Sequence, residues 1–226
     1  MDEHDNKLEV TVYLIDGSHY QFFSEDEAEI DRIYRSIQPN RVFGEKQYIM
    51  AGTYYMSGFA APAVTRIDFV SHTPPSWPHL GGVKEITEIS EEALDRRAIP
   101  RQSDPRRSEV QPKPGETMET FADFGLADGS RLCVKMTMEV HGAIDQRSRA
   151  YHMFTGPGFH VARRGGGVIL VNPRHIIRWS MYPGPAQTPT MAWRLHRIDP
   201  REWGGAPSKM FEKMDMSVPE DEQNKQ

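Results

Sequence analysis

The chain has 226 residues, and its 27 lysines and arginines against 32 aspartates and glutamates give a net charge of -5. This balance argues against a protein whose main task is to coat nucleic acid, because such domains are usually strongly basic. No apolar run is long enough to cross a bilayer, and the acidic first residues do not resemble a secretory signal. Because Cys133 is the single cysteine, an internal disulfide is excluded and a reducing, cytoplasmic setting is expected.

A faint internal repeat appears when the chain is compared with itself at an offset of 112 residues. Asp16-Gly17-Ser18 recurs as Asp128-Gly129-Ser130. Further identities at this offset are Leu14 with Leu126, Gly44 with Gly156, and Arg66 with Arg178. Both residues of an Asp-Gly pair tolerate positive φ, so each triplet predicts a hairpin turn. We therefore expect two related small units, residues 8–70 (copy 1) and 120–182 (copy 2).

In copy 1, alternating apolar residues before Asp16 predict a strand. A capping box at Ser24 and Glu27, followed by isoleucines at helical spacing, predicts a helix over 25–37. Residues 47–59 are rich in tyrosine and methionine and are also expected to form strand.

Residues 71–119 are expected to be a proline-rich linker or arm. Apolar residues at helical spacing allow a short helix near 83–97 within it, and basic residues follow. Residues 183–226 are again proline-rich and then polar, and we expect an extended C-terminal arm.

In copy 2, strict alternation over 132–140 predicts a half-buried strand. Residues 159–162 and 168–171 flank a glycine-rich segment and predict a hairpin. The fold class expected is therefore mainly β with a minor α component: two related small β-barrel or β-sheet units joined by a proline-rich linker. Such strand–turn–strand units resemble Sm-like or SH3-like small barrels at the level of pattern, and no functional residue is transferred on that basis.

The two copies are expected to pack together, because about 60 residues is small for independent stability. The contact is expected to involve the apolar faces that carry Val12, Leu14, Ile67, Phe124, Leu126 and Trp179.

The C-terminal arm carries aromatic and arginine residues in alternation, which is typical of interface anchors. The predicted partner-binding residues are Trp193, Arg194, Arg197, Arg201 and Trp203. The same composition would suit stacking on single-stranded nucleic acid, or packing of the arm back over its own barrel. A protein partner is the favoured interpretation.

The glycine-rich turn of copy 2 is a candidate anion-binding loop, because its glycines allow N–H groups to converge beside two guanidinium groups. Its residues are Arg163, Arg164, Gly165, Gly166 and Gly167. A simple hairpin turn with solvated arginines is the favoured alternative, since the segment matches neither the P-loop nor the dinucleotide fingerprint.

No convergent catalytic set is visible in the sequence. The nine histidines lack the short spacings of metal ligands, Cys133 lies in an alternating strand, and no nucleophile elbow is present. We therefore expect neither a cofactor nor a metal, and lean against an enzyme. The function expected is a soluble, non-catalytic subunit or adaptor that binds other proteins in a larger assembly. The alternative is an RNA- or anion-binding small-barrel module, whose binding would weaken steeply with salt.

Overall fold

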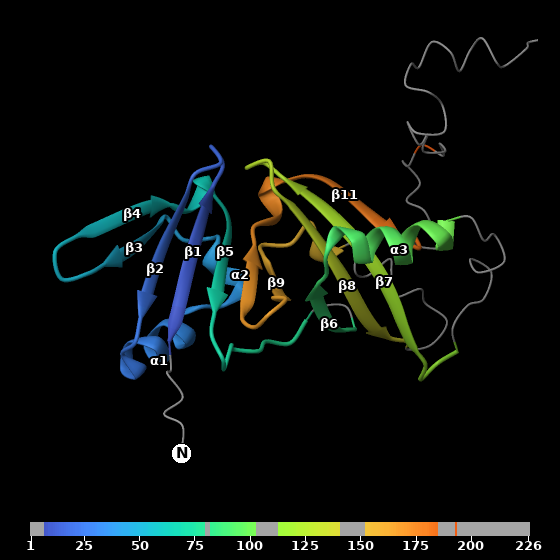
Figure 1. The fold of residues 1–226 in the computed structure, drawn as a ribbon, viewed down its shortest axis with the longest axis horizontal. Helices are drawn as coiled ribbons and strands as arrows, with labels where there is room; N and C mark the ends of the chain where they lie inside the picture. Colours follow the sequence, from blue (N-terminus) through green and yellow to red (C-terminus); the bar gives the residue numbers. More distant parts are fainter. Residues whose placement is uncertain (1–6, 80–81, 103–112, 141–151, 185–192, 194–226) are drawn as a thin grey trace, which may run out of the picture. The chain divides into compact units, whose positions relative to one another are not determined.

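The computed structural model describes residues 7–79, 82–102, 113–140, 152–184 and 193 (Figure 1). The strands of the first half are β1 (Leu8–Leu14), β2 (His19–Ser24), β3 (Gln47–Ala51), β4 (Met56–Ala60) and β5 (Val64–Val70). The later strands are β6 (Val83–Glu88), β7 (Thr117–Leu126), β8 (Arg131–Glu139), β9 (Phe159–Ala162), β10 (Val168–Val171) and β11 (Ile176–Tyr182). The helices are α1 (Glu27–Ser36), α2 (Pro39–Val42) and α3 (Glu91–Gln102), with 3₁₀ turns η1 (Ala61–Ala63) and η3 (Pro173–His175).

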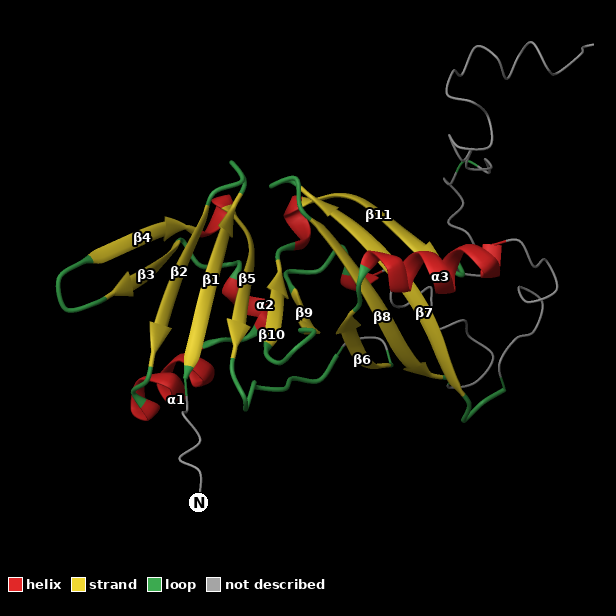
Figure 2. Ribbon diagram, viewed as in Figure 1, coloured by secondary structure: helices red, strands yellow, loops and turns green. Residues whose placement is uncertain are grey.

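The expectation of a mainly β protein is confirmed (Figure 2). A mixed sheet of nine strands has the order β11-β7-β8-β6-β9-β10-β5-β1-β2, and β3 pairs with β4 in a separate two-stranded sheet. All of these elements lie in the first of two units, Met1–Gln187. The expected form of each unit is a small barrel or a small sheet, and the described residues form a sheet and no closed barrel. The physical reason is that β10 of copy 2 pairs with β5 of copy 1, which joins the copies in one sheet.

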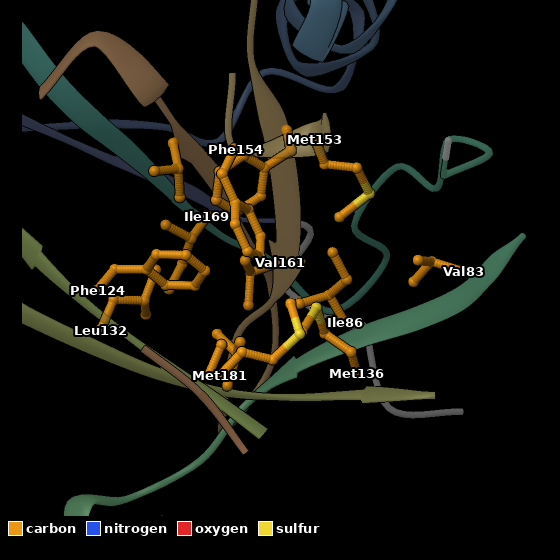
Figure 3. Packing of buried hydrophobic residues seen from close by; sticks show 14 of the residues in the cluster. Val83, Ile86, Phe124, Leu132, Met136, Met153, Phe154, Val161, Ile169 and Met181 are labelled. Atoms are coloured by element: carbon orange, nitrogen blue, oxygen red, sulfur yellow. The ribbon is translucent and has the colours of Figure 1, made fainter. Parts of the chain in front are cut away.

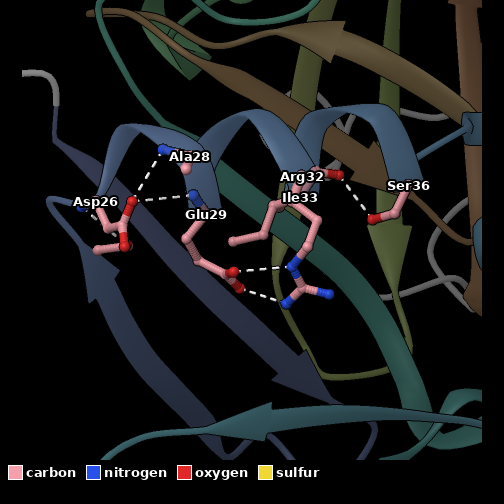
Figure 4. Close-up of polar contacts among 7 residues, drawn as sticks. Asp26, Ala28, Glu29, Arg32, Ile33 and Ser36 are labelled. Carbon is pink, nitrogen blue, oxygen red and sulfur yellow. Dashed lines mark hydrogen bonds and ion pairs between the residues drawn. The ribbon is translucent and has the colours of Figure 1, made fainter.

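Helix α1 confirms the helix predicted over 25–37, but its N-cap is Asp26 and not Ser24. The Oδ1 atom of Asp26 accepts hydrogen bonds from the backbone N–H groups of Ala28 at 2.9 Å and Glu29 at 3.2 Å (Figure 4). These bonds satisfy two of the N–H groups that a helix start leaves open. The side chain of Ile30 is buried in the core, where it packs α1 against the strands of copy 1.

The β1–β2 and β7–β8 hairpins have the same turn. In the first, Asp16 Oδ1 accepts hydrogen bonds from the N–H group of Ser18 at 2.9 Å and from its hydroxyl at 2.6 Å. In the second, Asp128 Oδ1 accepts the corresponding bonds from Ser130 at 2.8 and 2.6 Å. The glycine between them, Gly17 or Gly129, has a φ of +84° in both turns. This conformation favours glycine because a Cβ atom would be strained.

Strand order and register are also repeated at the offset of 112 residues. β5 lies beside β1 as β11 lies beside β7, and a short 3₁₀ turn precedes β5 and β11 alike. The equivalent cross-strand pairs are Val12–Ile67 with Phe124–Trp179, Tyr13–Arg66 with Gly125–Arg178, and Leu14–Val64 with Leu126–Ile176. Each set contains a register shift at the same place. The sets β5-β1-β2 and β11-β7-β8 therefore have one geometry.

Two main clusters of buried side chains lie on opposite faces of β10. Val168 and Leu170 join a cluster built mainly from copy 1, here called the copy 1 cluster. Ile169 and Val171 join a cluster built from β6, β7, β8 and β9, the copy 2 cluster (Figure 3). Successive side chains of a strand point to opposite faces, so one short strand contributes to both cores.

The contact between the copies therefore differs from the one expected. Val12, Leu14 and Ile67 belong to the copy 1 cluster, and Phe124 and Leu126 belong to the copy 2 cluster. Trp179 is 38% exposed and belongs to neither, and the copies meet through the β5–β10 pairing. The short helix expected near 83–97 is also wrong in its first part, since residues 83–88 form β6 and α3 begins at Glu91. The division into units 8–70 and 120–182, separated by 71–119 and followed by 183–226, stays a prediction.

Candidate protein-binding surfaces

Several strands have an edge that no other described strand covers. β2 and β11 are the end strands of the large sheet, while β3 and β4 pair only with each other. Large hydrophobic side chains are exposed on or beside these strands: Tyr20, Phe23, Ile49, Tyr54, Tyr55, Met56, Ile177 and Trp179. An open edge offers unpaired N–H and C=O groups, and natural edges are usually protected by charge, proline or a bulge. Exposed apolar groups at an open edge are therefore typical of a protein contact.

A groove of about 930 Å³ opens between α1, β2 and the β3–β4 hairpin. Its lining includes buried side chains of the copy 1 cluster, among them Leu8 and Phe69. Phe23 and Ile49, which also line it, are 70% and 55% exposed. Charged residues of both signs, including Arg41 and Glu45, line the groove as well. The groove has the mixed character of a surface that accepts an amphipathic segment.

The predicted partner-binding residues of the C-terminal arm fall almost entirely outside the described residues. Trp193 is described, and its side chain is 87% exposed. Arg194, Arg197, Arg201 and Trp203 lie outside the described part of the chain. Their role in binding stays a prediction.

The segment Arg163–Gly167 connects β9 to β10, as predicted for a glycine-rich hairpin. The N–H group of Arg164 donates to Glu88 Oε2 at 2.9 Å, so a carboxylate of the chain already occupies this donor. A Cβ atom on Gly167 would lie 2.1 Å from the carbonyl oxygen of Phe69. Glycine is required there because β10 approaches the backbone of β5 closely. These contacts are those of a structural turn, and anion binding at this loop stays a prediction.

The arginines at the repeated positions each meet a buried carboxylate. Arg66 Nε lies 3.4 Å from Asp68 Oδ1, and the guanidinium of Arg66 lies 4.0 Å from the centre of the Tyr13 ring. In copy 2, Asp123 Oδ1 lies 2.9 Å from Arg178 Nη2. Asp68 and Asp123 are 5% and 2% exposed. Because substrate could not reach either carboxylate, we assign both pairs to stabilisation of the sheet.

The carboxylates of these pairs lie on different strands of the two copies. Asp68 on β5 is paired with Thr11 on β1, whereas Asp123 on β7 is paired with Ser180 on β11. The two cross-strand pairs are equivalent at the offset of 112. The carboxylate is on the second strand of the pair in copy 1 and on the first strand in copy 2, and the hydroxyl is on the other strand in each case. Comparison of identical residues misses this exchange, and Asp68 and Asp123 went unnoticed in the sequence for that reason.

Two histidine rings stack beside a small cavity of about 310 Å³. The ring centres of His79 and His160 are 3.9 Å apart, and Trp77 contacts His160 edge-on. Burial, followed by the nearness of His79, lowers the pKa of His160 to about 4. Burial likewise raises the pKa of the Cys133 thiol to about 11, so this thiol is a weak nucleophile at neutral pH.

No group of three His, Cys, Asp or Glu side chains arranged to hold a metal is found among the described residues. Within the same residues, none of the helices has the length and apolar character needed to cross a membrane. Comparisons with protein families, curated proteins and solved structures found no match to this chain.

Proposed function

We propose that this chain is a non-catalytic subunit that binds other protein chains in a larger assembly through its sheet edges and the groove of copy 1. The observation that carries this proposal is the exposure of large apolar side chains on strands with open edges. Phe23 on β2 is 70% exposed, Ile49 on β3 is 55% exposed, and Met56 on β4 is 75% exposed. Binding of a partner strand satisfies the backbone groups of an edge and removes such side chains from water.

The chemistry of the buried polar groups supports the same proposal. The carboxylates paired with Arg66 and Arg178, those of Asp68 and Asp123, are buried, and burial lowers the pKa of both stacked histidines. Each group has a structural partner, and none is presented at the 930 Å³ groove. The groove combines apolar area with charged side chains of both signs, which suits the binding of an amphipathic segment.

The proposal predicts that polar substitutions on this surface remove partners without unfolding the chain. Phe23→Ser, Ile49→Ser and Tyr54→Ser combined should lower recovery of co-purifying proteins at least tenfold, because each side chain is more than half exposed. The measurement is quantitative mass spectrometry of proteins bound to the tagged full chain in lysate of its native host.

The matched control combines Lys84→Ser, Glu92→Ser and Arg96→Ser, which are exposed on β6 and α3. Thermal unfolding of the wild type, the surface variant and the control variant verifies that each protein is folded. Equal recovery of the same partners by both variants, or no enriched protein with the wild type, would contradict the proposal.

A further inference from the structure

The pairing between the two copies shows which strand binds the edge of β5. β10 of copy 2 lies antiparallel to β5 of copy 1, with Ile169 opposite Asp68 and Leu170 opposite Ile67. Val168 and Leu170 are 2% and 0% exposed in the copy 1 cluster. This contact is therefore a continuous part of the sheet and of the core.

The equivalents of these two strands both have an edge that no other described strand covers. At the offset of 112, β10 corresponds to β4 and β5 corresponds to β11. Among the described strands, β4 pairs only with β3, and β11 pairs only with β7. The β10–β5 pairing thus occurs once within the described chain, while the equivalent edges of β4 and β11 pair with no described strand.

The side chains on β4 and β11 are more exposed than their equivalents in the β5–β10 contact. Met56, the equivalent of the buried Val168, is 75% exposed. Trp179, the equivalent of Ile67, is 38% exposed, whereas Ile67 is 2% exposed. β4 has the sequence MSGFA, without the charge or proline that usually protects an edge.

We infer that β4 of one molecule pairs antiparallel with β11 of a second copy of this chain, so that copies assemble head to tail. This inference rests on the proposed function, because it names the partner of two of the same edges. The register of the inner contact places Ser57 opposite Ser180 and Gly58 opposite Trp179 of the second copy. The glycine leaves room for the indole, and neither of these pairs places like charges opposite each other. Such a heterologous contact forms a ring if the rotation between copies closes, and a filament if it does not.

Cysteine cross-linking tests the direction of this contact. Full-length Ser57→Cys and Ser180→Cys proteins are prepared separately, mixed, and treated with a short bis-maleimide. The mixture should yield covalent dimers, and each protein alone should yield few, because a head-to-tail contact joins unlike edges. Cys133 is 3% exposed, so the wild-type chain serves as the unreactive background.

A matched control replaces Ser57→Cys by Ser18→Cys, a half-buried serine in the β1–β2 turn. This mixture should not cross-link. Light scattering of the wild type should give a mass above that of one chain, and Met56→Asp should weaken self-association at least tenfold, while Arg96→Asp, an exposed position on α3, should leave it unchanged.

The outcomes separate this inference from the proposed function. A monomeric wild type, cross-linking of Ser57→Cys with itself, or equal yields from the control mixture would each overturn head-to-tail assembly. A monomer that still captures other proteins through Phe23 and Ile49 would overturn the inference alone. A monomer that captures nothing would overturn both.

Discussion

His160 on β9 is surrounded by rings that disfavour a positive charge. It stacks on His79 and contacts the edge of Trp77, and its side chain is almost completely buried. Its pKa is lowered from 6.5 to about 4, first by burial and then by the nearby His79. The unfolded chain therefore binds a proton between these pH values that the folded chain does not bind.

This difference predicts a loss of stability on acidification that depends on His160. The free energy of unfolding should fall by on the order of 2 kcal/mol as pH decreases from 6.5 to about 4 because of this group alone. His160→Phe should flatten that part of the profile, and His72→Gln, an exposed histidine, should not. The measurement is urea unfolding across this pH range.

Asp68 affects the same profile with the opposite sign. Burial raises its pKa from 3.8 to about 6, so the folded chain binds the extra proton between those values. Its contribution favours folding as the pH falls, and it is present in the wild type and both variants. The difference between profiles therefore isolates His160, and identical slopes for wild type and His160→Phe would contradict the prediction.

Among single residues, those that act locally were predictable and those that act across strands were not. The Asp-Gly-Ser turns follow from the conformational freedom of glycine and from bonds within three residues, so Asp16 and Asp128 have the turn role expected. The burial of Asp68 and of Asp123 depends on neighbours brought together by strand pairing. The sequence contains no local signal for such pairing.

At the scale of elements, the β9–β10 hairpin owes its position to Gly167. A Cβ atom there would overlap the carbonyl oxygen of Phe69, and its φ is +105°. Gly165 in the same turn has a φ of +86° but nothing within 4 Å of a Cβ position. Comparison of the two positions therefore distinguishes the cost of backbone strain, present at both, from the cost of the close approach of β10 to β5, present only at Gly167.

Alanine substitutions at these glycines should differ strongly in cost. Gly165→Ala should lower the free energy of unfolding by about 1 kcal/mol, which is the strain of a left-handed residue. Gly167→Ala should lower it by more than about 3 kcal/mol, because β10 must also move away from β5. Urea unfolding at neutral pH measures both. Equal costs would show that the close approach contributes nothing.

Elements with strong local patterns were predictable, and their neighbours in the sheet were not. Alternation identified β8 and the β9–β10 hairpin, and helical spacing identified α1. The segment 83–88 was misassigned because its apolar residues fit helical spacing, whereas pairing with β8 makes it a strand. Pairing of β10 with β5 joins residues about 100 positions apart, and alternation within a strand does not specify its partner.

At the scale of the whole molecule, copy 1 depends on copy 2 for part of its core. Val168 and Leu170 of β10 are buried in the copy 1 cluster and lie opposite Phe69 and Ile67 of β5. Without β10, one edge of β5 would be unpaired and the copy 1 cluster would lose the side chains of Val168 and Leu170. Removing each buried aliphatic side chain costs about 2–5 kcal/mol in a typical core, against a total stability of about 5–15 kcal/mol.

This dependence predicts that copy 1 does not fold by itself. A fragment of residues 1–79 should lack a cooperative unfolding transition, whereas a fragment of residues 1–187, which keeps β10, should retain one. Circular dichroism during thermal and urea unfolding measures the transition in each fragment, with the full chain as the reference. Two self-contained units joined by a linker would give the opposite result, namely a cooperative transition of the 1–79 fragment. The fragments thus decide whether the repeated halves are separate domains or one sheet in which copy 2 supplies β10 to copy 1.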